Sequence, residues 1–354
     1  MNRSTYIEIN LSNIKHNIQQ VIQKYSGFCY YFGVAKADCY GHGIDSISSM
    51  IDGGINYLVV ATLEEALEVR KLNNKIPILC LGIVKNENIQ NAIQNDITIS
   101  ISSLEYLNTI DISNLKGGKV HIKVNTGMNR LGVSTKEEFM CVYDALTKND
   151  VYIEGLYSHI YEAGNDKLTK KQYDKFEQII NQIDISNIKI IHIQASEAIT
   201  KYPKKDYING CRLGIIMYGF SNDKNLELKS TFKVLSEVIQ VNTLIKGDTV
   251  GYDGAYVAKE DIEKIAVIPI GYADGIIRKN TLRYVYINGK RYQIVGNICM
   301  DMLFVKVDNS VKLFDSVEVL KDIKHISEVA NYLKTIPYEV ICSLGKRVPR
   351  IYTK

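Results

Sequence analysis

The chain has 354 residues, 46% hydrophobic and 23% charged, which is the composition of an ordinary globular protein long enough for two domains. Its 43 basic and 39 acidic residues give a net charge of +4, and no run of Lys and Arg gathers that charge as nucleic-acid binding requires. No segment has the layout of a signal peptide or approaches the roughly 18 consecutive apolar residues of a membrane-spanning helix. We therefore expect a cytoplasmic protein, or the cytoplasmic domain of a membrane-tethered one, with no membrane segment in this chain.

The seven cysteines are scattered and never form a CxxC pair. This pattern predicts neither a disulfide framework nor a zinc site, and it suits a reducing cytosol. The GxGxxG, P-loop, HExxH and GxSxG signatures are absent, which removes the strongest signs of dinucleotide, nucleotide, zinc-protease and serine-hydrolase chemistry. We expect no metal ion.

From residue 28 to about 216, short β-branched and aromatic runs alternate with segments of helical period such as 63–72 and 168–184. This alternation predicts repeated βα units around a parallel sheet. The expected strands are 28–35, 57–61, 77–81, 97–101, 119–124, 152–158, 189–195 and a weaker one near 210–213. Eight strands indicate an N-terminal (β/α)8 TIM-type barrel, which we assign to residues 1–227.

After residue 228 the pattern changes to longer alternating strands joined by turn signals such as Asn288-Gly289. Alternation with tight turns is typical of antiparallel sheets. Residues 228–354 are therefore expected to form a mostly antiparallel β domain. Residues 5–9 also alternate, so we expect them to be a strand of that domain.

In barrel enzymes the active site lies at the C-terminal ends of the strands, so the residues after each apolar run are candidates. Lys36 directly ends the first run. Burial there favours the neutral amine, which can form a Schiff base, but a lysine at this position can equally extend to the rim of the barrel. The pattern alone leaves both readings open.

The string around Lys36, AKADCYGHG, resembles the VKANAYGHG motif of alanine racemases. Further segments follow in that family's order: KVNTGMNRLG, GLYSH, RLGIIMYG, VGYDGAY, PIGYADG and GNICMD. The resemblance covers nearly the whole chain. It implies an amino-acid racemase that uses pyridoxal 5'-phosphate (PLP) bound to Lys36.

The family's functional residues carry over onto matching positions. The resemblance implies that Lys36 and Tyr252 are the two catalytic bases, Tyr252 acting on the L isomer and Lys36 on the D isomer. In the family this tyrosine comes from the partner subunit, so a homodimer with shared sites is implied. The implied cofactor contacts, besides Lys36, are Tyr40, His159, Ser196, Arg212, Gly214, Ile215 and Tyr338.

The resemblance also implies that Arg130, Met300 and Tyr272 bind the substrate, with Arg130 on its carboxylate and Tyr272 in the motif of the entry channel. In many family members the lysine matching Lys123 is carbamylated, which we take as a hypothesis here. In the family the arginine matching Arg212 faces the pyridine nitrogen of PLP. Since a guanidinium does not give up its proton, that nitrogen stays unprotonated.

Two departures from the family pattern bear on the site. Ala195 stands where the family has an asparagine, and Asn297 stands where it commonly has an arginine. Taken singly, a loop arginine such as Arg130 usually forms a salt bridge. A strand-end histidine such as His159, or a tyrosine such as Tyr252, usually has only a structural role in the packing of the core. We treat His192 as a structural residue.

Three alternatives remain. The first is a serine or serine/alanine racemase domain, as in the membrane-bound enzymes of glycopeptide-resistant bacteria. The second is a PLP homeostasis protein, which would be a single barrel without Tyr252. The third is a basic amino-acid decarboxylase, which would carry a glutamate at the position of Arg212.

Overall fold

The fold is taken from a computed structural model that describes residues 3–354. The chain forms two compact units. The barrel unit comprises Lys15–Cys39 and Ile44–Leu228, and the C-terminal unit comprises residues 3–14, Tyr40–Gly43 and Lys229–Lys354. Two segments that precede residue 228 therefore belong to the C-terminal unit.

Eight parallel strands close into a barrel, with β9 pairing back onto β2. The strands β4 and β5 are buried along their whole length, because helices cover their outer face while the barrel interior covers the other. The predicted (β/α)8 barrel is confirmed. Its strands are β2 (Tyr30–Val34), β3 (Tyr57–Val60), β4 (Ile78–Cys80), β5 (Ile97–Ile101), β6 (Lys119–Lys123), β7 (Tyr152–Tyr157), β8 (Ile190–Ala195) and β9 (Gly210–Leu213).

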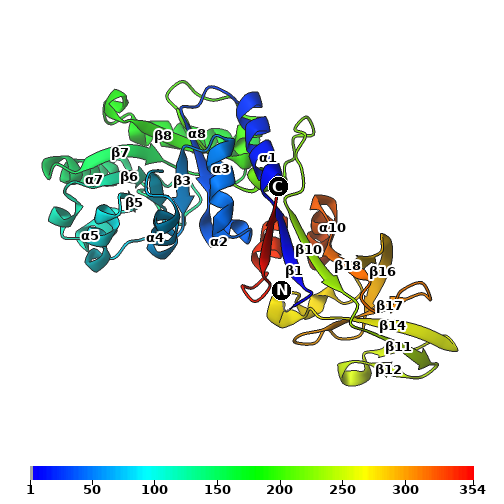
Figure 1. Ribbon diagram of the computed structural model, residues 1–354. Helices are drawn as coiled ribbons and strands as arrows, with labels where there is room; N and C mark the ends of the chain where they lie inside the picture. Colours follow the sequence, from blue (N-terminus) through cyan, green and yellow to red (C-terminus); the bar gives the residue numbers. More distant parts are fainter. Residues whose placement is uncertain (1–2) are drawn as a thin grey trace. The chain divides into compact units, whose positions relative to one another are not determined.

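Helices alternate with these strands and surround them (Figure 1). They are α3 (Ile47–Gly53), α4 (Leu63–Leu72), α5 (Asn86–Gln94), α6 (Leu104–Asn108), α7 (Lys136–Lys148), α8 (Asp166–Ile180) and α9 (Ser196–Lys201), preceded by α1 (Leu11–Lys24). The helix α4 coincides with the predicted segment 63–72, and a capping box between Thr62 and Glu65 fixes its start.

The C-terminal unit contains a nine-stranded sheet in the order β11-β14-β17-β16-β15-β18-β10-β1-β19. All its pairings are antiparallel except that of β1 with β19, so the predicted second, mostly antiparallel domain is also confirmed. The strands are β1 (Tyr6–Asn10), β10 (Phe232–Glu237), β11 (Gln240–Ile245), β14 (Ile262–Ile268), β15 (Tyr284–Ile287), β16 (Lys290–Val295), β17 (Leu303–Val307), β18 (Ser316–Leu320) and β19 (Arg350–Thr353).

The N-terminal strand β1 lies between β10 and the C-terminal strand β19, drawn red in Figure 1. A short hairpin of β12 (Thr249–Val250) and β13 (Tyr256–Val257) and the helices α10 (Ile323–Leu333) and α11 (Pro337–Cys342) complete this unit. At the turn between β15 and β16, Asn288 and Gly289 both have positive φ, as a two-residue hairpin loop requires.

Within residues 3–354, no helix combines the length and the apolar character needed to cross a membrane.

Candidate functional site

Three residues singled out from the sequence lie at the C-terminal edge of three neighbouring barrel strands. Lys36 follows β2, Arg212 lies on β9, and Ser196 follows β8. The strand β9 pairs with both neighbours, and Arg212 is in register with Ala195 on one side and Phe32 on the other. The fold thus brings these side chains to one end of the barrel.

The backbone that follows Lys36 forms a left-handed turn. The element α2 (Lys36–Tyr40) contains four consecutive non-glycine residues, 37–40, with φ between 52° and 56°. Each such residue costs roughly 1–2 kcal/mol relative to the right-handed form. Strained backbone of this kind persists only where its surroundings hold it, and it is concentrated at functional sites.

Glu65 holds the start of this turn. Its carboxylate accepts hydrogen bonds from Ala37 N and from Ala61 N, each at 2.7 Å, in addition to its part in the α4 capping box. Buried Cys39 adds a backbone hydrogen bond from its N to Ala35 O at 3.0 Å. The sequence interpretation missed Glu65, although the Thr-x-x-Glu spacing of a capping box is visible in it.

The Arg212 guanidinium is buried and held along its Nη edge. Nη1 donates to His192 Nδ1 at 2.6 Å, while Nη2 donates to Ser158 O at 2.7 Å, Ile193 O at 3.1 Å and His159 Nδ1 at 3.1 Å. Burial lowers the pKa of Arg212 to about 10, which leaves it cationic at neutral pH. Within residues 3–354, its Nε–H has no hydrogen-bond acceptor.

His159 follows β7 and lies beside Arg212, whose Nη2 donates to its Nδ1 at 3.1 Å. Burial and the nearby charges of Arg212, Arg130, Lys123 and Lys36 lower the pKa of His159 to about 3. It is therefore neutral at physiological pH. Because its Nδ1 accepts a hydrogen bond from Arg212, the ring proton is on Nε2.

Lys123 ends β6 and is buried. Burial, together with the positive charges of Arg130, Arg212 and Lys36, lowers the pKa of Lys123 to about 8. No carboxylate or other acceptor bonds to its Nζ within residues 3–354. The result is an amine that lies over the Tyr157 ring and is partly neutral near pH 8.

Arg130 lies in the exposed loop that follows β6. Asn125 shapes this loop: its Oδ1 accepts from Gly127 N at 3.0 Å and Asn129 N at 3.1 Å, and its Nδ2 donates to Ser134 Oγ at 3.0 Å. The side chain thereby replaces backbone partners along the loop. Asn125 is a second residue whose role the sequence interpretation missed.

Ser196, Gly214 and Ile215 meet at the ends of β8 and β9. Ser196 Oγ accepts a hydrogen bond from Gly214 N at 3.0 Å, and Ile215 begins the short 3₁₀ helix η4 (Ile215–Tyr218). Ala195 is the N-cap residue of α9 and supplies no side-chain cap. The asparagine of the family pattern would have offered a polar group at this position.

The remaining candidates belong to the C-terminal unit. The rings of Tyr40 and Tyr338 pack with centroids 5.9 Å apart. Tyr272 N and Ala273 N donate to Cys299 O and Met300 O, each at 3.0 Å, so the Tyr272 and Met300 segments are adjacent.

Tyr252 is 68% exposed and begins the short 3₁₀ helix η5 (Tyr252–Gly254). Asn297 Nδ2 donates to Tyr252 O at 3.1 Å and to Asp253 Oδ2 at 3.2 Å. The departure at Asn297 thus has a local role, since it fastens the segment that carries Tyr252.

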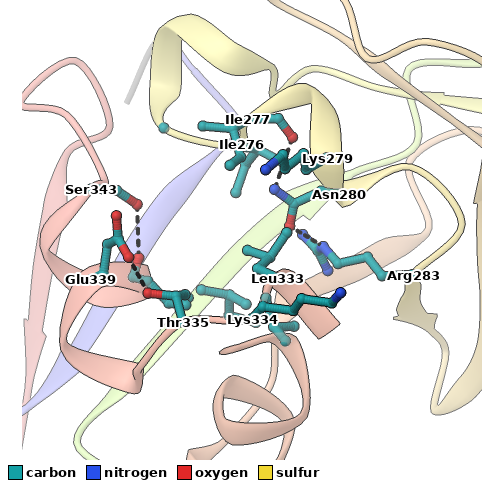
Figure 2. Close-up of a pocket in the computed structure, with 14 residues that line it drawn as sticks. Ile276, Ile277, Lys279, Asn280, Arg283, Leu333, Lys334, Thr335, Glu339 and Ser343 are labelled. Atoms are coloured by element: carbon teal, nitrogen blue, oxygen red, sulfur yellow. Dashed lines mark hydrogen bonds between the residues drawn. The ribbon is translucent and has the colours of Figure 1, made fainter. Parts of the chain in front are cut away.

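The C-terminal unit also contains a pocket of about 240 Å³ (Figure 2). Arg283 lies in its wall and donates from Nε to Asn280 Oδ1 at 2.6 Å, whereas its buried Nη2 has no partner within residues 3–354. None of the residues predicted to be functional lines this pocket.

Polar residues missed by the sequence interpretation fill part of the barrel interior. His192, treated as structural, donates to or accepts from both Arg212 and His121, and His121 reaches Glu154. Burial alone would raise the pKa of Glu154, but its hydrogen bonds lower it to about 2. No group of three or more His, Cys, Asp or Glu side chains within the described part of the chain is arranged to hold a metal ion.

The comparisons with known proteins cover the whole chain. The family model described as alanine racemase, N-terminal domain matches residues 9–222, and that of the C-terminal domain matches residues 231–352. Alanine racemase 1 of Bacillus subtilis is 34% identical over 99% of this chain and 93% of its own length. The alanine racemase of Halalkalibacterium halodurans is 36% identical over 99% and 95%.

Solved structures agree in fold. The alanine racemase of Clostridium difficile 630 superposes with a TM-score of 0.93 at 31% identity, covering 100% of this chain and 96% of the other. That of Bacillus anthracis with bound L-Ala-P gives 0.92 at 29%, with the same coverage. The chain belongs to the alanine racemase family, and so to the isomerases.

Proposed function

We propose that this protein is a PLP-dependent alanine racemase that interconverts L- and D-alanine through two bases, Lys36 and Tyr252. The observation that carries the proposal is the convergence of Lys36, Arg212 and Ser196 on one edge of the barrel. The relatives that match over 99% of this chain are named alanine racemases, and their names support alanine as the substrate.

The residues at this edge fit PLP. Lys36 supplies a primary amine for the aldehyde carbon of PLP, and Ser196 with the Gly214 and Ile215 amides supplies neutral donors for a phosphate. The Arg212 Nε–H is a donor with no acceptor among the described residues, as expected of a group that faces a pyridine nitrogen. When bound, PLP delocalises the charge left on the substrate Cα after proton removal.

The side chains divide the remaining work. Arg130 binds the substrate carboxylate, which a guanidinium matches in shape and charge. Lys36 takes or gives the Cα proton on one face, and the Tyr252 hydroxyl does so on the other. Neutral His159, with its proton on Nε2, is suited to hold the tyrosine oxygen by donating to it.

Tyr252 is proposed to serve the site of a partner subunit in a homodimer. Its high exposure supports this, because a catalytic side chain facing solvent in one chain is available to another. Mixing inactive Lys36→Ala and Tyr252→Phe chains tests the idea. Recovery of racemisation after subunit exchange requires one complete site built from two chains, whereas no recovery would place both bases in one chain.

The direct test of function is racemisation of L-alanine and L-serine side by side, with PLP added, followed by chiral chromatography. Turnover of alanine far above serine is expected. Equal or greater turnover of serine would favour the serine racemase alternative, and no turnover of either would overturn the proposal. Lys36→Ala is expected to abolish both the activity and the visible absorption band of lysine-bound PLP.

The product D-alanine is proposed to feed peptidoglycan precursors in the cytoplasm. All seven cysteines have free thiols, which supports a reducing compartment.

A further inference from the structure

A chain of hydrogen bonds runs through the barrel interior from Arg212 to Glu154. Arg212 Nη1 lies 2.6 Å from His192 Nδ1, His192 Nε2 lies 3.1 Å from His121 Nδ1, and His121 Nε2 lies 3.3 Å from Glu154 Oε2. Both imidazoles are completely buried, and Glu154 is 2% exposed. Four strands, β6 to β9, supply one residue each.

The two ends of the chain fix its direction. Arginine is only a donor, and an ionised carboxylate is only an acceptor. His192 must therefore accept at Nδ1 and carry its proton on Nε2, which it donates to His121 Nδ1. His121 then also carries its proton on Nε2 and donates it to Glu154, so both rings are neutral Nε2–H tautomers.

The neutral state of both rings agrees with their surroundings. Burial, with the positive charge of Arg212 nearby, lowers the pKa of His192 well below its ordinary value. Burial also lowers the pKa of His121, in spite of Glu154. A proton added to His192 would stand in the dry interior next to the Arg212 cation, and burial opposes one on His121.

Arg212 has no carboxylate among its direct partners. Its other acceptors are the uncharged Ser158 O, Ile193 O, His192 O and His159 Nδ1. A buried cation without a counter-charge is costly. The hydrogen-bonded chain ends on an anion, and each polarised imidazole passes part of that negative charge towards the guanidinium.

Glu154 is itself fixed at the far end. Tyr57 Oη donates to its Oε2 at 2.8 Å, and Lys189 Nζ donates to its Oε1 at 3.1 Å. Tyr57 Oη also bonds to Thr98 Oγ1 at 2.7 Å. These contacts keep the carboxylate ionised and aimed at His121.

We propose that Glu154, acting through His121 and His192, is a positioning residue that keeps Arg212 charged and turned with its Nη edge into the barrel. The Nε–H is then left for the cofactor, since none of the hydrogen bonds of Arg212 within residues 3–354 uses it. The effect on racemisation rests on the proposed role of Arg212 towards PLP, but the tautomers and the coupling of the two histidines do not.

The test is ¹⁵N NMR of histidine-labelled protein, as purified, in the wild type and in Glu154→Gln. In the wild type, His121 and His192 are expected as neutral rings with the proton on Nε2. A carboxamide carries no charge, so in Glu154→Gln the ring N–H protons of both histidines lose their downfield shift. Glu154 does not contact His192, so a change in the His192 resonances shows that the hydrogen-bonded series through His121 transmits the effect.

Glu177→Gln is the matched control. Glu177 is in the same unit and likewise accepts from a lysine and a tyrosine, Lys205 and Tyr207. It is not part of the series of hydrogen bonds from Arg212 to Glu154. It should leave the His192 resonances and kcat unchanged. Glu154→Asp, which keeps the charge, should restore part of what Glu154→Gln loses.

In kinetic assays Glu154→Gln should lower kcat roughly tenfold or more, the size of one lost charge-assisted hydrogen bond, with little change in KM for alanine. An unchanged His192 spectrum in Glu154→Gln overturns the proposal, as does a wild-type His192 that is doubly protonated or protonated on Nδ1. The wild-type spectrum decides this even if the variant does not fold. A wild type that does not racemise alanine would count against the proposed function. The tautomers of His121 and His192 would still test the proposed hydrogen-bond network.

Discussion

Lys123 is expected to react with carbon dioxide to form a carbamate. The ammonium first loses one proton to solvent. The neutral amine then attacks CO₂, a new N–C bond forms, and a second proton leaves to solvent, so the side chain changes overall from a cation to an anion. With its pKa lowered from 10.5 to about 8, about a quarter of Lys123 is neutral near pH 7.5, against about one in a thousand for an ordinary lysine. The reactive fraction is thus a few hundredfold larger.

The surroundings of Lys123 favour the product. Arg130 and Arg212 lower the pKa of the amine by repulsion, and the same two charges attract a carbamate anion. The Nζ also lies 5.7 Å from the centroid of the Tyr157 ring, in a buried place where hydration of the ammonium is poor. Carbamylation would remove one positive charge from the cluster and add a partner for Arg130.

Carbon-13 NMR of protein equilibrated with ¹³C-bicarbonate measures the adduct. A carbamate resonance is expected in the wild type, and it should grow as the pH rises through about 8 at constant dissolved CO₂. Lys123→Met should lack it, while Lys119→Met, at the other end of β6 where the lysine pairs with Asp96, should keep it. No carbamate signal in the wild type, or one that survives Lys123→Met, would refute the reasoning.

Three further outcomes are expected. Tyr252→Phe should block proton removal from L-alanine while exchange at the Cα of D-alanine partly persists, as followed by deuterium incorporation from D₂O into each isomer. Glu65→Ala, which removes the α4 capping box and the bond to Ala37 N, should lower the free energy of unfolding by about 1–2 kcal/mol in urea titrations, with a correspondingly weaker hold on the turn after Lys36. The pKa of Glu154 is about 2 in the fold against an ordinary 4.5, so its ionised form stabilises the protein above about pH 4.5 and that contribution is lost as the pH falls towards 2. The stability difference between wild type and Glu154→Gln should therefore shrink between pH 5 and 3, and a constant difference would contradict this.

The barrel was predictable because its strands are short apolar runs at regular spacing. The expected segment 210–213 was weak, since it contains Cys211 and Arg212 rather than branched apolar residues, yet it became β9 because two neighbours pair with it. Tertiary pairing outweighs local pattern in such a strand. The grouping of residues 3–14 with the C-terminal unit follows from pairing too, since β1 is hydrogen-bonded to both β10 and β19.

Residues at strand ends were found, whereas partners inside the barrel were not. A strand-end residue is marked by its position after an apolar run, but His121, Glu154 and His192 lie within runs and resemble occasional polar interruptions of a core. Their meeting depends on which positions of three separate strands point into the barrel, and a single sequence does not specify the register that brings them together.

One residue of the sequence, Gly155, is nevertheless directly related to the packing inside the barrel. It lies on β7 in register with His121, and a Cβ at this position would come within 2.6–2.8 Å of three atoms of the His121 ring. Only the absence of a side chain leaves room for the imidazole between Glu154 and His192. A glycine in a buried parallel strand weakens the strand, so its presence is best explained by what it admits. The family resemblance showed that Gly155 belongs to a motif. The physical reason for a glycine at this position is the His121 ring, which a side chain there would displace.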